Sequence, residues 1–263
     1  MDEIGRAAVE SDGDGPTTLA IDVGGTGLKA VLLDGAGKMA TEEVRVPTTY
    51  PCPPDRLVAA LLGLTASLGA YDRLAVGFPG MVRRGRVLSA PHFVTVQGPG
   101  SAIDPVLEQR WDRFDLAAAL EAEFARPTRV VNDADLQGAA VVEGRGLELV
   151  VTLGTGVGTA LFLDGALAPH LEFAHHPFRH DQTYNEQLGD RARKQVGNGR
   201  WNHRVGKAMA TLYRLTLFDH LYVGGGNAKH VSVDLGSRAT LVDNVAGLLG
   251  GFKLWHGRLF EHA

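Results

Sequence analysis

The sequence predicts a mixed α/β fold in which two glycine-rich turns flank one strand–helix junction. Three stretches predict it: residues 19–29, 130–138 and 150–160. The first and third share one layout, in which a Gly/Thr turn joins two apolar runs, as in a strand hairpin. In the second, an apolar run ends at Asn132 and Asp133, and a helical pattern begins. Polar side chains at the carboxyl end of a buried strand are where α/β sheets usually place their chemistry.

The junction has two interpretations from its residues alone. Asn132 offers both a donor and an acceptor to a ligand hydroxyl, and Asp133 could take a proton from such a hydroxyl. Asp and Asn also open helices as N-caps, which is their usual task at this position. The flanking turns favour a ligand site, because successive backbone N–H groups and Thr hydroxyls form an anion-binding concavity. Together the three stretches indicate a phosphoryl donor facing an acceptor hydroxyl.

Composition bounds the class of protein. With 263 residues, of which 44% are hydrophobic, the chain can build one large domain or two intimate ones. A net charge of −4 gives no reason to expect nucleic acid or membrane as a partner, and no apolar run is long enough to span a bilayer. Residues 1–16 lack the features of a signal peptide and are expected to be a disordered tail. A single cysteine, Cys52, fits a reducing cytoplasm.

In the first part of the chain, the pattern predicts a small sheet covered by a helix. The expected strands are 18–23, 28–33, 41–47 and 74–78. Leu57, Leu61, Leu64 and Leu68 recur at helical spacing and predict a helix over 54–68 that packs on this sheet.

Before the junction, the pattern predicts a hairpin tip, a loop and a helix. Arg83, Arg84 and Arg86 surround a glycine, which is typical of a hairpin tip with solvated charges. Gly and Pro in 97–105 predict a loop, and 114–124 is expected to be helical.

After the junction, residues 148–162 are expected to fold into a hairpin around the second Gly/Thr turn. Residues 218–223 predict a strand that leads into three glycines, and 240–255 predict a final helical stretch.

Six motifs together resemble the ROK family of sugar kinases, within the actin-like superfamily, and most closely its polyphosphate glucokinase branch. The motifs are Asp22-Val-Gly-Gly-Thr-Gly-Leu-Lys29, Gly77-Phe-Pro-Gly80, Asn132-Asp-Ala-Asp135, Leu153-Gly-Thr-Gly-Val-Gly158, Glu172-Phe-Ala-His-His-Pro177 and Gly224-Gly-Gly-Asn227. The resemblance implies an actin-like (ribonuclease H-like) fold of two α/β domains with the active site in the cleft between them. It also implies a smaller domain of 17–131 plus 241–263 and a larger one of 132–240.

The resemblance implies a glucokinase that transfers a phosphoryl group from inorganic polyphosphate, ATP or both to the 6-hydroxyl of glucose. Asp133 is then the general base, and Asp22 positions Mg²⁺ through water, although a plain turn carboxylate is the alternative for Asp22. The implied sugar-side set is Pro79, Gly80, Asn132, Asp133, Glu172, His175, Asn185 and Glu186. The implied donor-side set is Asp22, Gly24, Gly25, Thr26, Gly27, Lys29, Gly154, Thr155, Gly156, Gly158, Gly224, Gly225, Gly226 and Asn227. The family also implies a homodimer.

The chain departs from the family pattern at three points. Alanine stands at position 174, where the family has glycine, and the family's zinc-binding cysteine cluster is absent. The histidines near it (His170, His175, His176 and His180) offer no thiolates and no zinc-type spacing, so we expect no zinc. Where the family usually has another sugar-binding glutamate, the chain has Asn185, so that either Asn185 or the next residue, Glu186, serves as the ligand.

Two further interpretations stay open. A basic stretch could follow a polyanion, or it could be a solvated helix face; it consists of Arg191, Arg193, Lys194, Arg200, Arg204 and Lys207. The activity could also be that of an ATP-dependent kinase of another hexose, such as mannose or fructose. A non-catalytic sugar-binding regulator is the alternative of another class, although the residues before the first strand are too few for a helix-turn-helix module.

Overall fold

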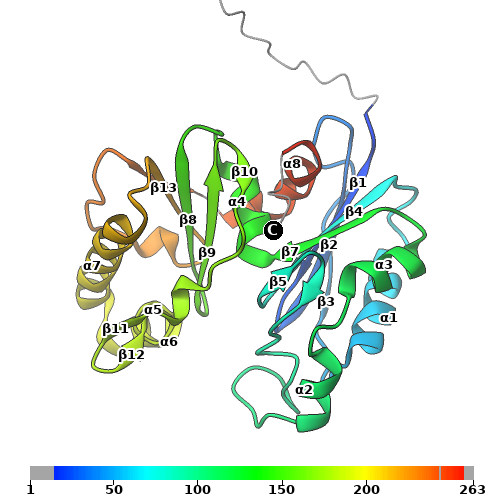
Figure 1. Cartoon of the computed structure of the whole chain (residues 1–263), viewed down its shortest axis with the longest axis horizontal. Helices are drawn as coiled ribbons and strands as arrows, with labels where there is room; N and C mark the ends of the chain where they lie inside the picture. Colours follow the sequence, from blue (N-terminus) through cyan, green and yellow to red (C-terminus); the bar gives the residue numbers. More distant parts are fainter. Residues whose placement is uncertain (1–14, 243, 258–263) are drawn as a thin grey trace, which may run out of the picture.

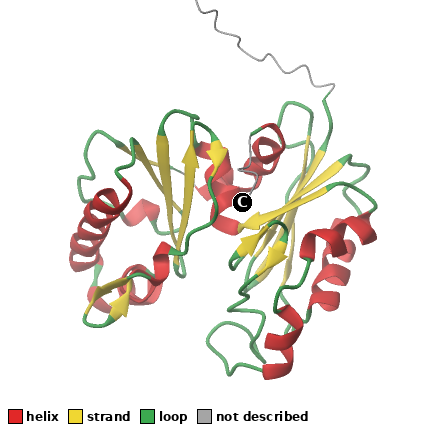
Figure 2. Cartoon of the chain, in the orientation of Figure 1, coloured by secondary structure: helices red, strands yellow, loops and turns green. Residues whose placement is uncertain are grey.

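The computed structural model describes residues 15–242 and 244–257, without the side chains of 244–246. Nearly all of the tail expected at 1–16 therefore lies outside the described residues. The described part forms two lobes, each built on a five-stranded sheet, with helices α4 and α8 between the two sheets (Figures 1 and 2). The fold is the mixed α/β fold that the sequence predicts.

The first sheet has the order β3-β2-β1-β4-β7. Its strands are β1 (Thr18–Val23), β2 (Gly27–Leu33), β3 (Val44–Pro47), β4 (Arg73–Phe78) and β7 (Thr128–Asn132). The three strands β1, β2 and β3 pair antiparallel, whereas β4 lies parallel to β1 and β7 parallel to β4. The carboxyl ends of β1, β4 and β7 therefore lie at one edge of the sheet, where β7 hands the chain to α4.

The second sheet repeats this plan with the order β10-β9-β8-β13-β14. Its strands are β8 (Leu147–Leu153), β9 (Val157–Leu163), β10 (Ala166–Leu167), β13 (His220–Gly224) and β14 (Ala239–Leu241). Again an antiparallel hairpin is followed by two parallel neighbours. Each Gly/Thr turn is thus the tip of the corresponding hairpin, β1–β2 in one lobe and β8–β9 in the other.

Helices cover the outer face of the first sheet. They are α1 (Pro54–Thr65), α2 (Pro105–Trp111) and α3 (Leu116–Phe124), and the small hairpin of β5 (Val82–Arg83) and β6 (Arg86–Val87) lies beside them. Asp104 caps α2 by accepting from the N–H of Val106, and Asp115 caps α3 by accepting from that of Ala118. Their apolar faces join one buried cluster with the strands, centred on Phe78, Phe93 and Trp111.

The second lobe carries its helices on the face away from the first lobe. They are α5 (Tyr184–Leu188), α6 (Asp190–Val196) and α7 (Asn198–Thr216), with the short strands β11 (Pro177–Arg179) and β12 (Gln182–Thr183) and the 3₁₀ turns η1 (Phe173–His175) and η2 (Ala228–His230). Trp201 anchors α7, because its indole is fully buried and donates to the carbonyl of Leu188.

Helices α4 (Asp133–Val141) and α8 (Gly250–His256), together with η3 (Asn244–Leu249), join the two lobes. Helix α8 packs on β1, β4 and α4. Two glycines allow this approach: a Cβ at Gly250 would overlap the carbonyl oxygen of Leu136, and one at Gly251 would lie 2.8 Å from Cβ of Ala20. The predicted domain bounds stay a prediction, but the end of the described chain does return to the first sheet.

Three expectations about elements need correction. The strand expected over 41–47 begins only at Val44. The loop expected over 97–105 ends in α2, an extra helix that starts at Pro105 because Asp104 and Pro105 form a favourable cap. The helix expected over 240–255 was wrong at its start, because Thr240 and Leu241 pair with β13 as part of β14. None of the described helices is both long and apolar enough to cross a membrane.

Candidate functional site

The junction between β7 and α4 holds the two residues on which the site was predicted. Asn132 is the N-cap of α4: its Oδ1 accepts from the N–H of Ala134 at 2.7 Å. Its Nδ2 donates to the carbonyl oxygen of Gly80 at 2.9 Å. The capping interpretation is therefore confirmed for Asn132, and its amide also ties the buried Pro79–Gly80 turn to the start of the helix. Its role as a sugar ligand stays a prediction.

Asp133 opens α4 among other carboxylates. Burial raises the pKa of its carboxyl group to about 7, helped by the negative charges of Asp22, Glu172 and Asp135, although the N–H of Ala134 opposes the rise. A carboxylate with a pKa near neutrality suits a general base, because it is free to accept a proton at physiological pH and holds it well.

Asp22 is the next-to-last residue of β1, which is separated from β7 by β4, and its charge acts on Asp133. Burial raises the pKa of its carboxyl group, the charge of Lys29 opposes this, and Glu43 adds to it. Lys29 Nζ lies 3.9 Å from Asp22 Oδ2. Within residues 15–242 and 244–257, no three His, Cys, Asp or Glu side chains are grouped so as to hold a metal ion.

The first Gly/Thr turn connects β1 to β2, and its carbonyl groups are held from behind. The hydroxyl of Thr48 donates to the carbonyl oxygen of Gly24, and that of Tyr50 to the carbonyl oxygen of Gly25, both at 2.7 Å. The N–H groups of Gly25 and Thr26 have no acceptor among the described residues. A turn with anchored carbonyls and free N–H groups is suited to an anion.

The second Gly/Thr turn, between β8 and β9, is built in the same way. The carbonyl oxygen of Gly154 accepts from the N–H of Asp190 at 2.9 Å and from Nδ2 of Asn227 at 3.0 Å. The backbone N–H groups of Thr155 and Gly156 donate no hydrogen bond within the described part of the chain. Both turns thus present donors of the kind that bind phosphate oxygens.

The glycine run after β13 lies against the second turn. Gly225 has a left-handed φ of 86° and touches the backbone of Leu153, where a side chain would collide. Asn227 is buried and donates its backbone N–H to the carbonyl of Leu153 at 2.8 Å. At Gly226, a Cβ would meet open space. The fold therefore brings the predicted donor-side residues Gly224 to Asn227 next to Gly154.

The segment after β10 carries a histidine between two carboxylates. Nδ1 of His170 lies 3.0 Å from Asp135 Oδ1, and Nε2 lies 3.3 Å from Glu172 Oε1. Burial alone would lower the pKa of this histidine, but the two carboxylates outweigh it and raise the pKa to about 10. Glu172 is partly exposed, and His175 is exposed close to it. Burial would raise the pKa of the Glu172 carboxyl group, but His170 lowers it through direct contact and charge, and His175 adds a smaller lowering effect. Glu172 and His175 thus stay together as a predicted sugar-binding pair.

Asn185 and Glu186, the alternative ligands on α5, make different contacts. Oδ1 of Asn185 accepts from the N–H of Val157 at 2.9 Å, so its amide braces the second Gly/Thr turn. The carboxylate of Glu186 accepts from the N–H and the hydroxyl of Thr183, which closes a capping box at the start of α5. Which of the two binds sugar stays a prediction.

A polar groove of about 670 Å³ runs from the second turn along α5 and α6. Thr155, Arg191 and Arg204 are among the residues that line it. Burial lowers the pKa of Arg204, and the charges of Arg179 and Arg200 lower it further, so several guanidinium groups lie near one another here. Part of the basic stretch therefore borders a groove that opens beside a donor-side loop.

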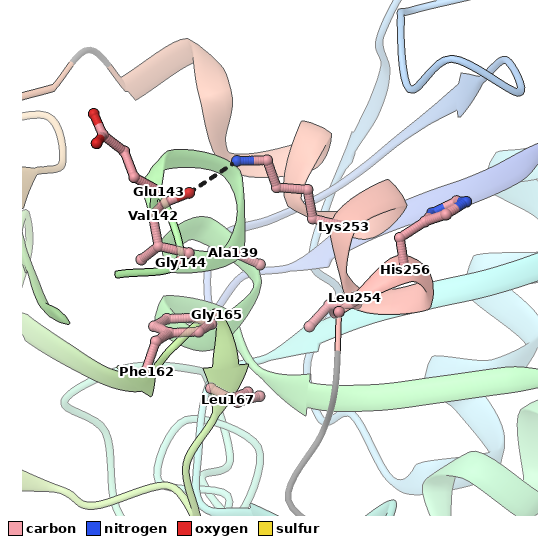
Figure 3. Close-up of a pocket in the computed structure, with 11 residues that line it drawn as sticks. Ala139, Val142, Glu143, Gly144, Phe162, Gly165, Leu167, Lys253, Leu254 and His256 are labelled. Atoms are coloured by element: carbon pink, nitrogen blue, oxygen red, sulfur yellow. Dashed lines mark hydrogen bonds between the residues drawn. The ribbon is translucent and has the colours of Figure 1, made fainter. Parts of the chain in front are cut away.

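A different cavity lies at the far end of α4, away from the junction. It has about 280 Å³ and is lined by apolar side chains such as Phe162, Leu167 and Leu254 (Figure 3). Nζ of Lys253 donates to the carbonyl oxygens of Ala140 and Val142 at 3.1 Å, so α8 caps the carboxyl end of α4. No predicted site residue lines this cavity.

Three supporting residues have roles that the sequence did not indicate. Thr48 and Tyr50 hold the first turn, and His170 joins two carboxylates. Glu172 is only two positions from His170, but the partners Gly24, Gly25 and Asp135 lie 24 to 35 positions away along the chain, and no local pattern predicts such a contact.

Comparison with known proteins places the chain in a family. The model of the ROK family matches residues 18–170. A polyphosphate glucokinase of Mycobacterium tuberculosis (strain CDC 1551 / Oshkosh) is 24% identical over 265 residues, which cover 91% of this chain and 93% of the relative.

Solved structures agree with the sequence match. The inorganic polyphosphate/ATP-glucomannokinase of Arthrobacter sp. strain KM superposes with a TM-score of 0.74 at 29% identity, over 90% of this chain and 97% of the other. A ROK family glucokinase of Streptomyces griseus, solved with glucose and AMPPNP, gives 0.71 at 18% identity over 90% and 98%, which shows the shared fold. The two sheets, their hairpin turns and the family match lead to one conclusion: the chain belongs to the ROK family and has the actin-like fold of ROK sugar kinases.

Proposed function

We propose that the protein is a glucokinase that transfers a phosphoryl group from inorganic polyphosphate, ATP or both to the 6-hydroxyl of glucose. One observation carries the proposal. Asp133, a carboxylate with a pKa of about 7, is the first residue of α4 and follows β7 directly, beside the two Gly/Thr turns that are suited to bind an anion. The names of two similar proteins, a polyphosphate glucokinase and an inorganic polyphosphate/ATP-glucomannokinase, support glucose as the acceptor and these two donors.

In this mechanism, Asp133 accepts the proton of the sugar hydroxyl as the hydroxyl oxygen attacks the terminal phosphorus. The bond between that phosphorus and the bridging oxygen of the donor breaks, and the shortened polyphosphate or ADP leaves with the bond's electron pair. Phosphoryl transfer asks the protein mainly to position the reactants and to offset charge. Glu172, His175 and the amide of Asn132 orient the sugar, with Asn185 or Glu186 completing the set. The N–H groups of the two Gly/Thr turns bind the oxygens of the donor.

Mg²⁺ fits this arrangement. It is usually held by one or two carboxylates, water and the phosphates themselves, so a full protein cage is not needed. Asp22 is the residue that would hold it, through water, with its partly exposed carboxylate at the end of β1. When bound, the ion offsets the charge of the donor. Lys29, 3.9 Å from Asp22, supplies a second positive charge nearby.

The groove beside Thr155 favours polyphosphate among the possible donors. A chain of phosphates that leaves the second turn along α6 would pass Arg191 and Arg204, and polyanions bind strongly to rows of such cations. An ATP-dependent kinase of mannose, fructose or another hexose is the second candidate, because Asn185 replaces an acidic sugar ligand by a neutral one. A non-catalytic sugar-binding regulator is the third. We also propose that the protein works as a cytoplasmic homodimer.

The test is hexose-6-phosphate formation by purified protein with glucose and Mg²⁺, with long-chain polyphosphate and ATP in parallel. We expect turnover with polyphosphate. Asp133→Asn should lower kcat by about 10²- to 10⁴-fold while glucose still raises the melting temperature, because only the proton acceptor is lost. Wild-type turnover in this variant would exclude Asp133 as the base. No turnover with either donor, despite glucose binding, would favour the regulator.

A comparison of the KM values for polyphosphate and for ATP tests whether the groove binds polyphosphate. Arg191→Gln and Arg204→Gln should each raise KM for polyphosphate and leave KM for ATP nearly unchanged. Lys207→Gln, a cation that is exposed on α7 and does not line the groove, is the matched control. Equal effects of all three variants on KM would mean that polyphosphate responds to the general positive charge of the surface and does not bind in the groove.

A further inference from the structure

His170 is the one histidine in the described chain that is almost completely buried between acidic side chains. Its side chain is 2% exposed, and that of Asp135 is 3% exposed. It belongs to neither of the predicted ligand sets.

Both ring nitrogens of His170 lie close to a carboxylate oxygen. Nδ1 is hydrogen-bonded to Asp135 Oδ1 at 3.0 Å, and Nε2 lies 3.3 Å from Glu172 Oε1, within ion-pair distance but without the alignment of a hydrogen bond. A neutral imidazole has one N–H and one lone pair, so it would place the lone pair against one of these oxygens. Only the imidazolium has an N–H on both nitrogens. The geometry therefore calls for a buried cation that serves two anions, an arrangement that is strongly destabilised when one partner is removed.

The two carboxylates belong to different parts of the candidate site. Asp135 lies in the first turn of α4, two residues after Asp133. Glu172 is at the start of η1, in the segment that carries the predicted sugar ligands. That segment is also held nearby by a hydrogen bond of 2.9 Å from the hydroxyl of Thr159 to the carbonyl of Leu171. His170 thus links the first turn of α4, which carries the proposed base, to the carboxylate of Glu172.

We propose that His170 is a positioning residue, whose imidazolium bridges Asp135 and Glu172 and fixes Glu172 relative to Asp133. The inference rests on the proposed function, in which Glu172 binds the sugar and Asp133 accepts its proton. Without the bridge, Glu172 loses its partner and turns away, and a misplaced ligand costs affinity and alignment. The donor-binding turns do not contact His170, so donor binding stays intact.

The first experiment measures glucose binding and kinetics of His170→Gln, which keeps one donor but no charge. We expect the Kd and the KM for glucose to rise about tenfold, and the KM for the phosphoryl donor to stay within about twofold of wild type, since the donor turns are untouched. His203→Gln is the control, because His203 is exposed on α7, and it should leave all three constants unchanged. Unchanged glucose binding in a folded His170→Gln variant would overturn the proposal.

The second experiment is nuclear magnetic resonance of the ring nitrogens in the wild-type protein, which does not depend on a variant that folds or on activity. One imidazole should stay protonated on both nitrogens at pH 8.5. In Glu172→Gln the same signal should titrate at lower pH, because one of its two charges is gone. If every histidine is neutral at pH 8.5, the bridge does not exist and the proposal is wrong.

Glucose binding and glucose phosphorylation are measured separately, so the His170 bridge and the kinase activity can fail independently. A wild-type protein that binds glucose without phosphorylating it would refute the kinase activity, while the Kd of His170→Gln for glucose would still test the bridge. A protein that phosphorylates glucose normally with Gln at position 170 would keep the kinase and refute the bridge.

Discussion

Asp133 shows how one side chain can be tuned for chemistry at a cost to the fold. Its carboxyl group sits close enough to Asp22 and Glu172 for their charges to raise its pKa, and burial raises it most. The shift to about 7 has two consequences. It sets the pH above which Asp133, the proposed base, has lost its proton. It also makes the charged form of Asp133 unfavourable in the folded protein.

The pH dependence of the reaction follows from the first consequence. The base must be unprotonated to accept a proton, so kcat/KM for glucose should fall below pH 7. At pH 6, kcat/KM for glucose should be about tenfold lower than its plateau at high pH. At a pH one unit below the pKa, only about one-tenth of the carboxyl groups are deprotonated. A pH–rate profile with a buffer-independent stability check measures this. A flat profile between pH 5.5 and 8 would contradict the assignment.

The pH dependence of stability follows from the second. Because the pKa of Asp133 is higher in the folded state than in the unfolded state, its protonation stabilises the fold at low pH. This contribution is lost progressively as the pH rises from the unfolded value of 3.8 to the folded value of about 7. Asp133→Asn removes the charge. We expect its melting temperature to exceed that of wild type by roughly 5 °C at pH 8.5 and by clearly less at pH 5. A larger gain in melting temperature at pH 5 than at pH 8.5 would mean that the folded state does not raise the pKa of Asp133.

Asn185 is the residue where structure sharpens the expectation. Its Oδ1 accepts from Val157 at the end of the second turn, so Asn185→Ala should loosen that turn. We expect KM for the donor to rise about fivefold, since one hydrogen bond of about 1 kcal/mol is lost. A steady-state comparison decides: if only KM for glucose rises, Asn185 is a sugar ligand and not a brace. Gln195→Ala, a variant in the same groove, serves as the control.

At the scale of elements, the contact between α4 and α8 depends on the absence of a side chain. A Cβ at Gly250 would overlap the carbonyl oxygen of Leu136, which belongs to the backbone of α4 and cannot move aside. Alanine normally favours a helix over glycine, by about 1 kcal/mol. At this position the sign should reverse.

Gly250→Ala should therefore lower the free energy of unfolding by several kcal/mol, as steric overlap of backbone in a packed contact does. The matched control is Gly63→Ala in α1, where a Cβ would meet nothing within 4 Å, and which should stabilise the protein by about 0.5–1 kcal/mol. Urea unfolding curves of both variants measure the difference. Similar stabilities would show that α8 can shift without loss.

The elements also show what the sequence could predict. The hairpins around both Gly/Thr turns, the helix at Leu57 and Leu61 and the strand–helix junction at Asn132 were predicted correctly, because each has a strong local pattern. Helix α2 was missed, since its signal is only a cap and a proline. Strand β14 was missed because Thr240 and Leu241 are held by pairing with a strand some 18 residues earlier.

The site was predictable to the extent that its residues lie in local motifs. Asp22, Asp133 and the glycines of the turns could be proposed from sequence because each lies at or just after the end of an apolar strand, and their roles stay predictions. The bridge at His170, and the brace at Asn185, could not be found because each depends on a partner brought near only by the fold. Local pattern identifies the reactive groups, and tertiary packing decides what each side chain touches.

At the scale of the molecule, one buried cluster joins the two lobes, each of which also has a core of its own. A single buried cluster contains Ala75 of the first sheet, Leu136 of α4, Phe162 of the second sheet and Leu254 of α8. Removal of apolar surface from water stabilises both lobes through the same contacts. The lobes should not melt independently.

We therefore expect one cooperative transition in differential scanning calorimetry, with equal calorimetric and van't Hoff enthalpies. Leu212→Ala, deep in the second lobe, should lower this single transition without splitting it. Two transitions, of which only one moves in the variant, would mean that α4 and α8 are a hinge with little shared core. Gly63→Ala is again suitable as a control, because it lies in the other lobe.

The return of α8 to the first sheet also matters for the order in which the protein is made. Ala20, Val31 and Leu33 are synthesised well before Leu248, with which they form one buried cluster. While the ribosome translates the intervening two hundred or so residues, this apolar face lacks that cover, and uncovered apolar surface is what chaperones bind and what aggregates. The nascent chain should therefore depend on a holding chaperone until α8 emerges, and a synthesis pause before codon 240 should lengthen that dependence.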